Sequence, residues 1–276
     1  RESKTQQARS QGMRNTVTVP SRAWYGDIDL TLAFPDRWTV HLLPPHDAPK
    51  LDRAGIEAAF ANPIGTPRIA ELARGKRSAA IVVDDISRPT PAAELIPYVL
   101  RELHEAGVPK GEIRFVIGGG SHRPQTAGGV GKKLGAGAPK SHNFMAGDLR
   151  GLGNLPDGTP LYVDPVVADA DFKMTVGGIY PHGAVGFGGG SKLILPGVSG
   201  FATMFHFQTF YPSRGQGNIE RQGPIPDHRD ASEAAARVLG LDVVVNGVIY
   251  VVIGGLLYAL GNSNGEDRPP EGQQPG

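Results

Sequence analysis

The sequence contains no cysteine in its 276 residues. This absence excludes a disulfide framework, a thiolate metal site and a cysteine nucleophile. A metal bound by this chain must therefore take its ligands from histidine, from carboxylates, or from a sulfur that the protein does not itself supply.

The sequence also lacks an excess of charge of either sign. It has 28 basic and 27 acidic residues, and its net charge is +1. A nucleic-acid-binding surface normally carries a basic stripe, and the charges of this chain do not cluster. We therefore expect no nucleic-acid partner.

Long hydrophobic runs are absent except between Val243 and Leu260. That run is barely long enough to span a bilayer, and Asn246, Gly247 and the pair Gly254-Gly255 interrupt it. Two short strands joined at Gly254-Gly255 explain it better, so we expect no membrane contact. The N-terminal charges precede no apolar segment of the signal-peptide kind, which predicts a cytoplasmic protein.

Glycine and proline are abundant, with 39 and 24 residues. Part of this excess lies in residues 262–276, which are polar and are expected to be a disordered tail. Residues 1–20 are expected to be a second disordered tail. Residues 21–240 then form one α/β domain, and the oligomeric state stays open.

Two consecutive segments repeat the order strand, polar loop, helix. Ser78 to Val83 is apolar on both faces, as in a central parallel strand, and a helix follows from Pro91 to about Ala106. The second unit has a strand from Ile113 to Ile117 and a weaker helix toward Leu134. Together they predict an α/β fold with an open, mostly parallel, Rossmann-like sheet and flanking helices.

Further elements complete this prediction. They are two β segments between Asp27 and Leu43, a helix from Asp52 to Phe60, strands at Thr159–Val163 and Phe172–Val176, and a helix at Ala231–Leu239. His41 and His46 lie beside the first β segments, where nothing converges on them. Both are expected to be structural or exposed to solvent.

The strand ending at Val176 leads into a loop, up to Gly197, that is unusually rich in glycine. His182 and Lys192 flank the central glycines Gly188, Gly189 and Gly190, so the loop is a candidate for close approach to a bound group. A tight surface turn between two buried strands would have the same composition. A phosphate loop is excluded, because Lys192 follows Ser191 instead of preceding it.

Three strand ends thus carry polar residues. Asp85 and Arg88 follow the first strand, His122 follows the second, and His182 and Lys192 follow Val176. In open α/β sheets the carboxyl ends of parallel strands form the ligand site. Imidazole exchanges protons near neutral pH and arginine holds carboxylates, so this set indicates acid/base chemistry on a small anion.

Four strings of the sequence support a more specific hypothesis: VVDDISRPTP, GGGSHRP, SHN and GGIYPHGAVGFGGGSKLILPGV. Their order and spacing resemble the N-terminal half of the nickel-dependent lactate racemase family, from about Val19 to Val245. The resemblance implies an isomerase that racemises or epimerises a small 2-hydroxy acid. An inactive or fragmentary relative that binds a nucleotide or hydroxy acid without turnover is the alternative.

The resemblance also implies a cofactor, the nickel pincer nucleotide, a pyridinium-3-thioamide-5-thiocarboxylic acid mononucleotide whose sulfurs bind nickel. Proteins that make and insert this cofactor would be partners. His122 and His182 match the family's catalytic pair, and Lys192 matches its covalent anchor. The remaining cofactor contacts implied are Asp84, Asp85, Arg88, Gly188, Gly189 and Gly190, and Arg88 would also bind substrate.

The chain departs from the family at the nickel-binding histidine. The nearest histidine, His206, stands two positions early, and Gln208 occupies the expected place. Nickel favours imidazole over amide, so His206 is the predicted metal ligand. Relatives also carry a second domain that closes over the cofactor, and residues 241–261 are expected to be the start of that domain, truncated here.

Overall fold

The computed structural model describes residues 15–20, 29–34, 49–135, 140–182, 185–210, 227–249 and 256–261. Its strands are β1 (Asn15–Pro20), β2 (Asp29–Phe34), β3 (Ala79–Asp84), β4 (Ile113–Gly118), β5 (Lys140–Ser141), β6 (Arg150–Asn154), β7 (Pro160–Val163), β8 (Phe172–Ile179), β9 (Pro181–His182), β10 (Gly186–Phe187), β11 (Val243–Ile249) and β12 (Leu256–Gly261). Its helices are α2 (Arg53–Ala61), α3 (Ile69–Leu72), α4 (Ala92–Glu105), α5 (Ala127–Leu134), α6 (Pro165–Ala168), α7 (Phe201–Phe210) and α8 (Asp227–Leu239), with 3-10 turns η1 (Lys110–Glu112) and η2 (Gly190–Leu193).

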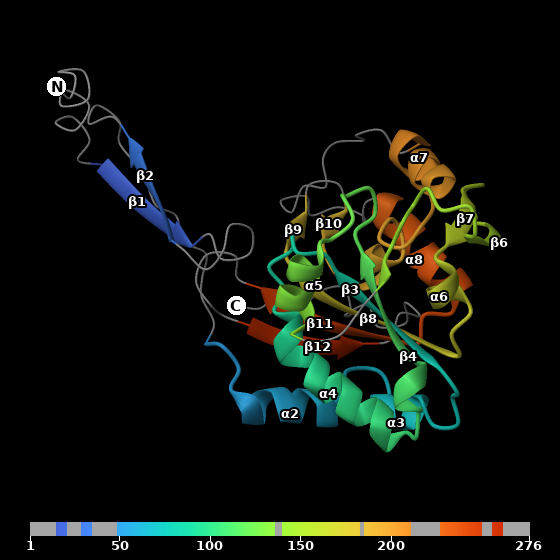
Figure 1. The fold of residues 1–276 in the computed structure, drawn as a ribbon, viewed down its shortest axis with the longest axis horizontal. Helices are drawn as coiled ribbons and strands as arrows, with labels where there is room; N and C mark the ends of the chain where they lie inside the picture. Colours follow the sequence, from blue (N-terminus) through green and yellow to red (C-terminus); the bar gives the residue numbers. More distant parts are fainter. Residues whose placement is uncertain are drawn as a thin grey trace, which may run out of the picture.

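A six-stranded sheet organises the chain, in the order β12-β11-β8-β3-β4-β5. All neighbours are parallel except the pair β11 and β12. Asp84 stands opposite Gly118, and Val83 stands opposite Val176. Because β3, β4 and β8 are neighbours in this register, the loops that follow them leave from one edge of the sheet (Figure 1). The predicted open, mostly parallel α/β sheet is therefore confirmed.

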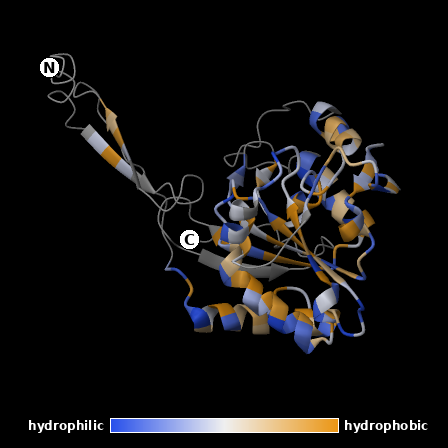
Figure 2. Ribbon diagram, viewed as in Figure 1, coloured by the Kyte–Doolittle hydropathy of each residue, from blue (hydrophilic) through white to orange (hydrophobic). Residues whose placement is uncertain are grey.

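Helices cover both faces of this sheet. Alternate residues of β3 show the division: Ile81 and Val83 pack with α2, α3, α4 and α5, whereas Ala80 and Val82 pack with α6, α8 and η2. All four side chains are fully buried, as expected for a strand apolar on both faces. In Figure 2 the central strands are coloured mainly as hydrophobic, and the helices alternate between hydrophobic and hydrophilic residues.

Local sequence signals explain several helix ends. The Asp52 side chain caps α2 by accepting from the Gly55 amide, and Thr126 caps α5 by accepting from the Gly129 amide. The helix α4 buries Leu95, Val99 and Leu103 on one face, as the apolar spacing predicts. Gly107 follows its end with φ +87, the left-handed conformation that glycine adopts most easily.

The C-terminal strands correct the predicted domain boundary. The sequence predicts that residues 241–261 begin a truncated second domain, but β11 pairs with β8 over six positions and extends the main sheet. Val243 and Val245 are fully buried in its core. The predicted pair of strands is present, and it belongs to this domain because β11 pairs with β8 and its side chains Val243 and Val245 join the core with α4 and β8.

The N-terminal segment differs from the prediction as well. The sequence predicts a disordered tail that includes residues 15–20, yet these residues form β1, which pairs antiparallel with β2. Alternating threonine and valine in NTVTVP suits a strand. Figure 1 shows this hairpin standing apart from the sheet. Residues 1–14 and 262–276, the segment 35–43 predicted as β, and both His41 and His46 lie outside the described residues.

Among the described helices, none combines the length and apolar character that a bilayer crossing requires.

The position of β11 can be tested by shortening one valine. Val245→Ala removes two methyl groups from a fully buried site and should lower the free energy of unfolding by about 2 kcal/mol. Val238→Ala on the exposed face of α8 is the matched control and should change it by less than about 0.5 kcal/mol. Urea denaturation gives both values, and equal effects would contradict the assignment of β11 to this core.

Candidate active site at the carboxyl edge of the sheet

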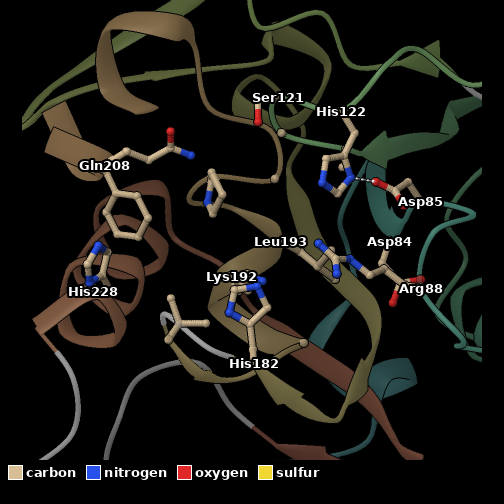
Figure 3. Close-up of a pocket in the computed structure, with 18 of the residues that line it drawn as sticks. Asp84, Asp85, Arg88, Ser121, His122, His182, Lys192, Leu193, Gln208 and His228 are labelled. Carbon is tan, nitrogen blue, oxygen red and sulfur yellow. Dashed lines mark hydrogen bonds and ion pairs between the residues drawn. The ribbon is translucent and has the colours of Figure 1, made fainter. Parts of the chain in front are cut away.

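One pocket lies where the three predicted loops meet (Figure 3). The loop after β3 contributes Asp84, Asp85 and Arg88, and the loop after β4 contributes Gly118 to His122. Tyr180, His182, Val185, Gly189, Lys192, Leu193, Pro196 and Gly197 follow from the end of β8 onward, and Phe207, Gln208 and His228 come from α7 and α8. The predicted convergence of Asp85, Arg88, His122, His182 and Lys192 is therefore present.

His122 is oriented by Asp85. Its Nδ1 lies 2.5 Å from the Asp85 carboxylate, which also accepts from the backbone and the hydroxyl of Ser87. Burial raises the pKa of Asp85, but the hydrogen bonds from Ser87 and His122 outweigh it and hold that pKa below its usual value. Because Nδ1 is engaged, Nε2 is the ring nitrogen left to face the pocket. Asp85 thus lines the pocket, and each of its carboxylate oxygens already has a partner within the protein, Ser87 for one and His122 for the other.

Asp84, predicted as a cofactor contact, forms its contacts with side chains of the protein itself. Its carboxylate accepts from the Thr90 hydroxyl and forms an ion pair with Lys133 Nζ at 2.6 Å, with both side chains about 5% exposed. Lys133 also donates to the carbonyls of Arg88 and Thr90 at 3.0 and 2.9 Å. Burial raises the pKa of Asp84 and the Lys133 ammonium opposes that effect. The ion pair of Asp84 and Lys133 therefore stabilises the turn after β3, which carries Arg88.

His182 stands on a short hairpin, in which it pairs with Gly186 across β9 and β10. Burial lowers its pKa to about 4, and the charges of Lys192, Arg88 and His228 act in the same direction. At neutral pH this imidazole is uncharged and can accept a proton. Burial together with the surrounding cations keeps it in that form, and no single sequence motif reveals either of them.

Lys192 projects into the pocket from η2 (Figure 3). Burial lowers the pKa of its amine to about 7, assisted by Arg88 and Arg229 and opposed by Asp85 and Asp84. A large part of this amine is therefore neutral, and nucleophilic, at physiological pH. The sequence predicted its place in the pocket but gave no sign of this pKa.

Of the three glycines predicted to contact a cofactor, only one lines the pocket. Gly189 lines it, whereas Gly188 and Gly190 do not. A Cβ on Gly188 would come within 2.6 Å of the Tyr180 ring, so that glycine is needed for packing inside the protein. The Gly190 amide donates to Asn246 Oδ1 at 3.1 Å. The loop is thus fitted to β8 and β11, and only partly to a ligand.

His206, the predicted metal ligand, is not brought to the pocket. Phe207 and Gln208 of α7 line it, and His206 does not. Two residues along a helix differ by about 200° in direction, so His206 and Gln208 face nearly opposite sides of α7. Ligand chemistry alone favours His206 over Gln208, but the sequence does not show which side of α7 faces the pocket.

Three residues that sequence reasoning missed shape the pocket. Lys133 is one of two adjacent lysines, and nothing in the sequence distinguishes it from Lys132 as the buried one. His228 lines the pocket from α8, and Tyr180 lies under the Arg88 guanidinium at 5.9 Å. The string IYPH could have drawn attention to Tyr180, which directly precedes the hairpin of His182.

The Lys133 ion pair generates a stability prediction. Lys133→Met leaves a buried carboxylate without its counter-charge and should lower the free energy of unfolding by about 3–5 kcal/mol. Arg150→Met breaks an ion pair with Asp169 that is about half exposed and should cost far less, because water and salt screen exposed charges. Adding Asp84→Asn to Lys133→Met should restore part of the loss. Equal costs for the two single variants in urea would refute this role.

Lys192 should react with acylating reagents at unusually low pH. Its labelling should rise with an apparent midpoint near its pKa of about 7, whereas ordinary lysines, with pKa about 10.4, remain protonated there. Arg88→Met removes one cation that lowers this pKa, so the midpoint should move upward. Peptide mass spectrometry of protein labelled across a pH series measures both, and a midpoint near 10 would contradict the burial of the amine.

Comparison with known proteins gives consistent matches. Residues 25–216 match the lactate racemase N-terminal domain. The lactate racemases of Thermoanaerobacterium thermosaccharolyticum and Lactiplantibacillus plantarum are each 31% identical over 204 residues, which cover 70% of this chain and 47% of each relative. The chain thus spans about half the length of the curated relatives it matches.

Two solved structures are also similar. The lactate racemase apoprotein of T. thermosaccharolyticum matches with a TM-score of 0.70 and 25% identity, over 90% of this chain and 59% of that one. A Thermotoga maritima protein matches with a TM-score of 0.59 and 20% identity, over 79% and 56% of the two chains, and supports the fold alone. From the match over residues 25–216 and these relatives, we conclude that the chain belongs to the lactate racemase N-terminal domain family.

Proposed function

We propose that this chain forms the cofactor-holding half of a racemase or C2 epimerase that acts on a small 2-hydroxy acid. The observation that carries the proposal is the meeting of two imidazoles, His122 and His182, with the amine of Lys192 in one pocket. The three come from separate loops at one edge of the sheet. Lactate racemases as relatives support the reaction class.

The pocket suits the nickel pincer nucleotide in one testable respect. Its donors are nitrogen and oxygen atoms, and the sequence has no cysteine, so a group that brings its own sulfur would complement it. Lys192, with its pKa near 7, could condense as a neutral amine with a thiocarboxylic acid: the N–C bond of a thioamide would form, the C–O bond would break, and the oxygen would leave as water. When bound, this cofactor supplies a hydride acceptor that also returns hydride to C2 of the substrate.

The two histidines would exchange the hydroxyl proton. His182 is neutral at working pH because its pKa is about 4, so it can act first as a base. His122 is oriented through Nδ1 by Asp85 and presents Nε2, from which it can give or take a proton. Inversion at C2 requires that each serves as base for one enantiomer and as acid for the other.

Arg88 would hold the substrate. Its guanidinium lies over the Tyr180 ring, and its backbone carbonyl is fixed by Lys133. Arginine binds a carboxylate through two parallel hydrogen bonds, which fixes the orientation of a 2-hydroxy acid at C2. The proposed partners are therefore this acid and the proteins that make and insert the cofactor.

The decisive experiment uses chain that is co-expressed with cofactor-making enzymes and supplied with the C-terminal half of the T. thermosaccharolyticum relative. We expect interconversion of the lactate enantiomers with retention of deuterium placed at C2, because hydride transfer keeps that atom. His122→Ala and His182→Ala should each abolish net racemisation, and Lys192→Ala should remove the mass adduct.

The outcomes separate the alternatives. Loss of the C2 deuterium to solvent would refute hydride transfer and indicate direct proton abstraction. An adduct on Lys192 without turnover of either enantiomer would favour a relative that binds the cofactor but does not react. Normal racemisation in both histidine variants would show that neither imidazole is the base.

A further inference from the structure

The pocket contains a third imidazole that neither the acid/base pair nor the sequence motifs account for. His228 stands in the first turn of α8 and lines the pocket. Figure 3 shows His228 and Gln208 at one side of the pocket, with His122 and Asp85 at the other and Lys192 between them. An imidazole therefore lies on the same side of the pocket as Gln208, and it comes from α8, not from α7.

The ring of His228 is held in a defined orientation. It meets the Phe207 ring edge-on, with ring centroids 4.9 Å apart and an angle of 89° between the planes. Phe207 is buried and immediately precedes Gln208. An imidazole packed in this way needs little further ordering to bind a ligand, which favours a fixed coordinating role.

The helix that carries His228 is also fastened to the loop that carries Lys192. Ser232 donates to the Leu195 carbonyl at 2.8 Å, and the Arg229 guanidinium lies 3.5 Å from the carbonyls of Phe187 and Gly189. These contacts fix α8 against the segment from Phe187 to Leu195. A group anchored at Lys192 would therefore be presented to His228 at a constant position.

From these contacts we propose that His228 is the protein's imidazole ligand to the metal of the group anchored at Lys192. The inference rests on the proposed function. Nickel prefers imidazole to an amide, so Gln208 is the weaker donor on this side. His206 lies on the other side of α7. The ligand would thus come from α8 instead of α7.

The test measures metal retention instead of activity. Protein co-expressed with the cofactor-making enzymes is purified as wild type, His228→Ala, His228→Phe and His206→Ala. The phenylalanine variant keeps an aromatic ring beside Phe207 and guards against a folding defect, and His206→Ala removes an imidazole at the site predicted from sequence. Intact mass gives the Lys192 adduct, and nickel per adduct is followed during a chelator challenge.

Both His228 variants should keep the adduct and lose nickel faster than wild type, by about tenfold or more. X-ray absorption should show one imidazole fewer around nickel in these variants, and His206→Ala should behave as wild type. Equal nickel retention in wild type and His228→Phe, or nickel loss in His206→Ala instead, would overturn the assignment. Absence of any adduct from wild type would refute the proposed function itself, and the inference with it.

Discussion

The buried ion pair between Lys133 and Asp84 is the interaction on which the rest of the site depends. Burying two charges costs several kcal/mol, and only close geometry with further hydrogen bonds offsets that cost. Lys133 meets this condition with one carboxylate and two carbonyls, all at the turn after β3. Because this turn carries both Asp85 and Arg88, the ion pair fixes the imidazole of His122 and the guanidinium together.

The two carboxylates of the pocket lining are each paired with a cationic or imidazole side chain, which limits how far they offset the pocket's positive charges. Asp84 pairs with Lys133 and Asp85 with His122, so neither offsets the cations fully. Burial lowers the pKa values of Lys192 and His182, and nearby cations lower them further: Arg88 and Arg229 act on Lys192, and Lys192 and Arg88 act on His182. If the proposed 2-hydroxy acid enters this pocket, its carboxylate would meet a charged arginine, a partly neutral amine and a neutral base, which is the division of roles that acid/base chemistry on a carboxylate needs.

Much of this arrangement could be predicted from the sequence, because it depends on local patterns. Apolar runs located β3, β4 and β8, and parallel pairing then placed His122, His182 and Lys192 at one edge. The predictions that were wrong concern features that depend on contacts between distant segments of the chain. The partner of Gly188 is the Tyr180 ring, and the choice between His206 and Gln208 depends on the rotation of α7. The role of β11 required knowing that β8 still had an open edge.

Asn246 connects that added strand to the loop of Lys192. Its side chain, buried at 8% exposure, accepts from the Gly190 amide at the start of η2. Successive residues of a strand point to opposite faces, so a shift of β11 by a single residue would replace this amide with valine or glycine. A shift by two residues restores the face but brings Val244 or Val248 to this position, so the contact requires the register of β11 as it stands. Homologues that vary the connection between α8 and β11 should preserve an amide or hydroxyl at this register position.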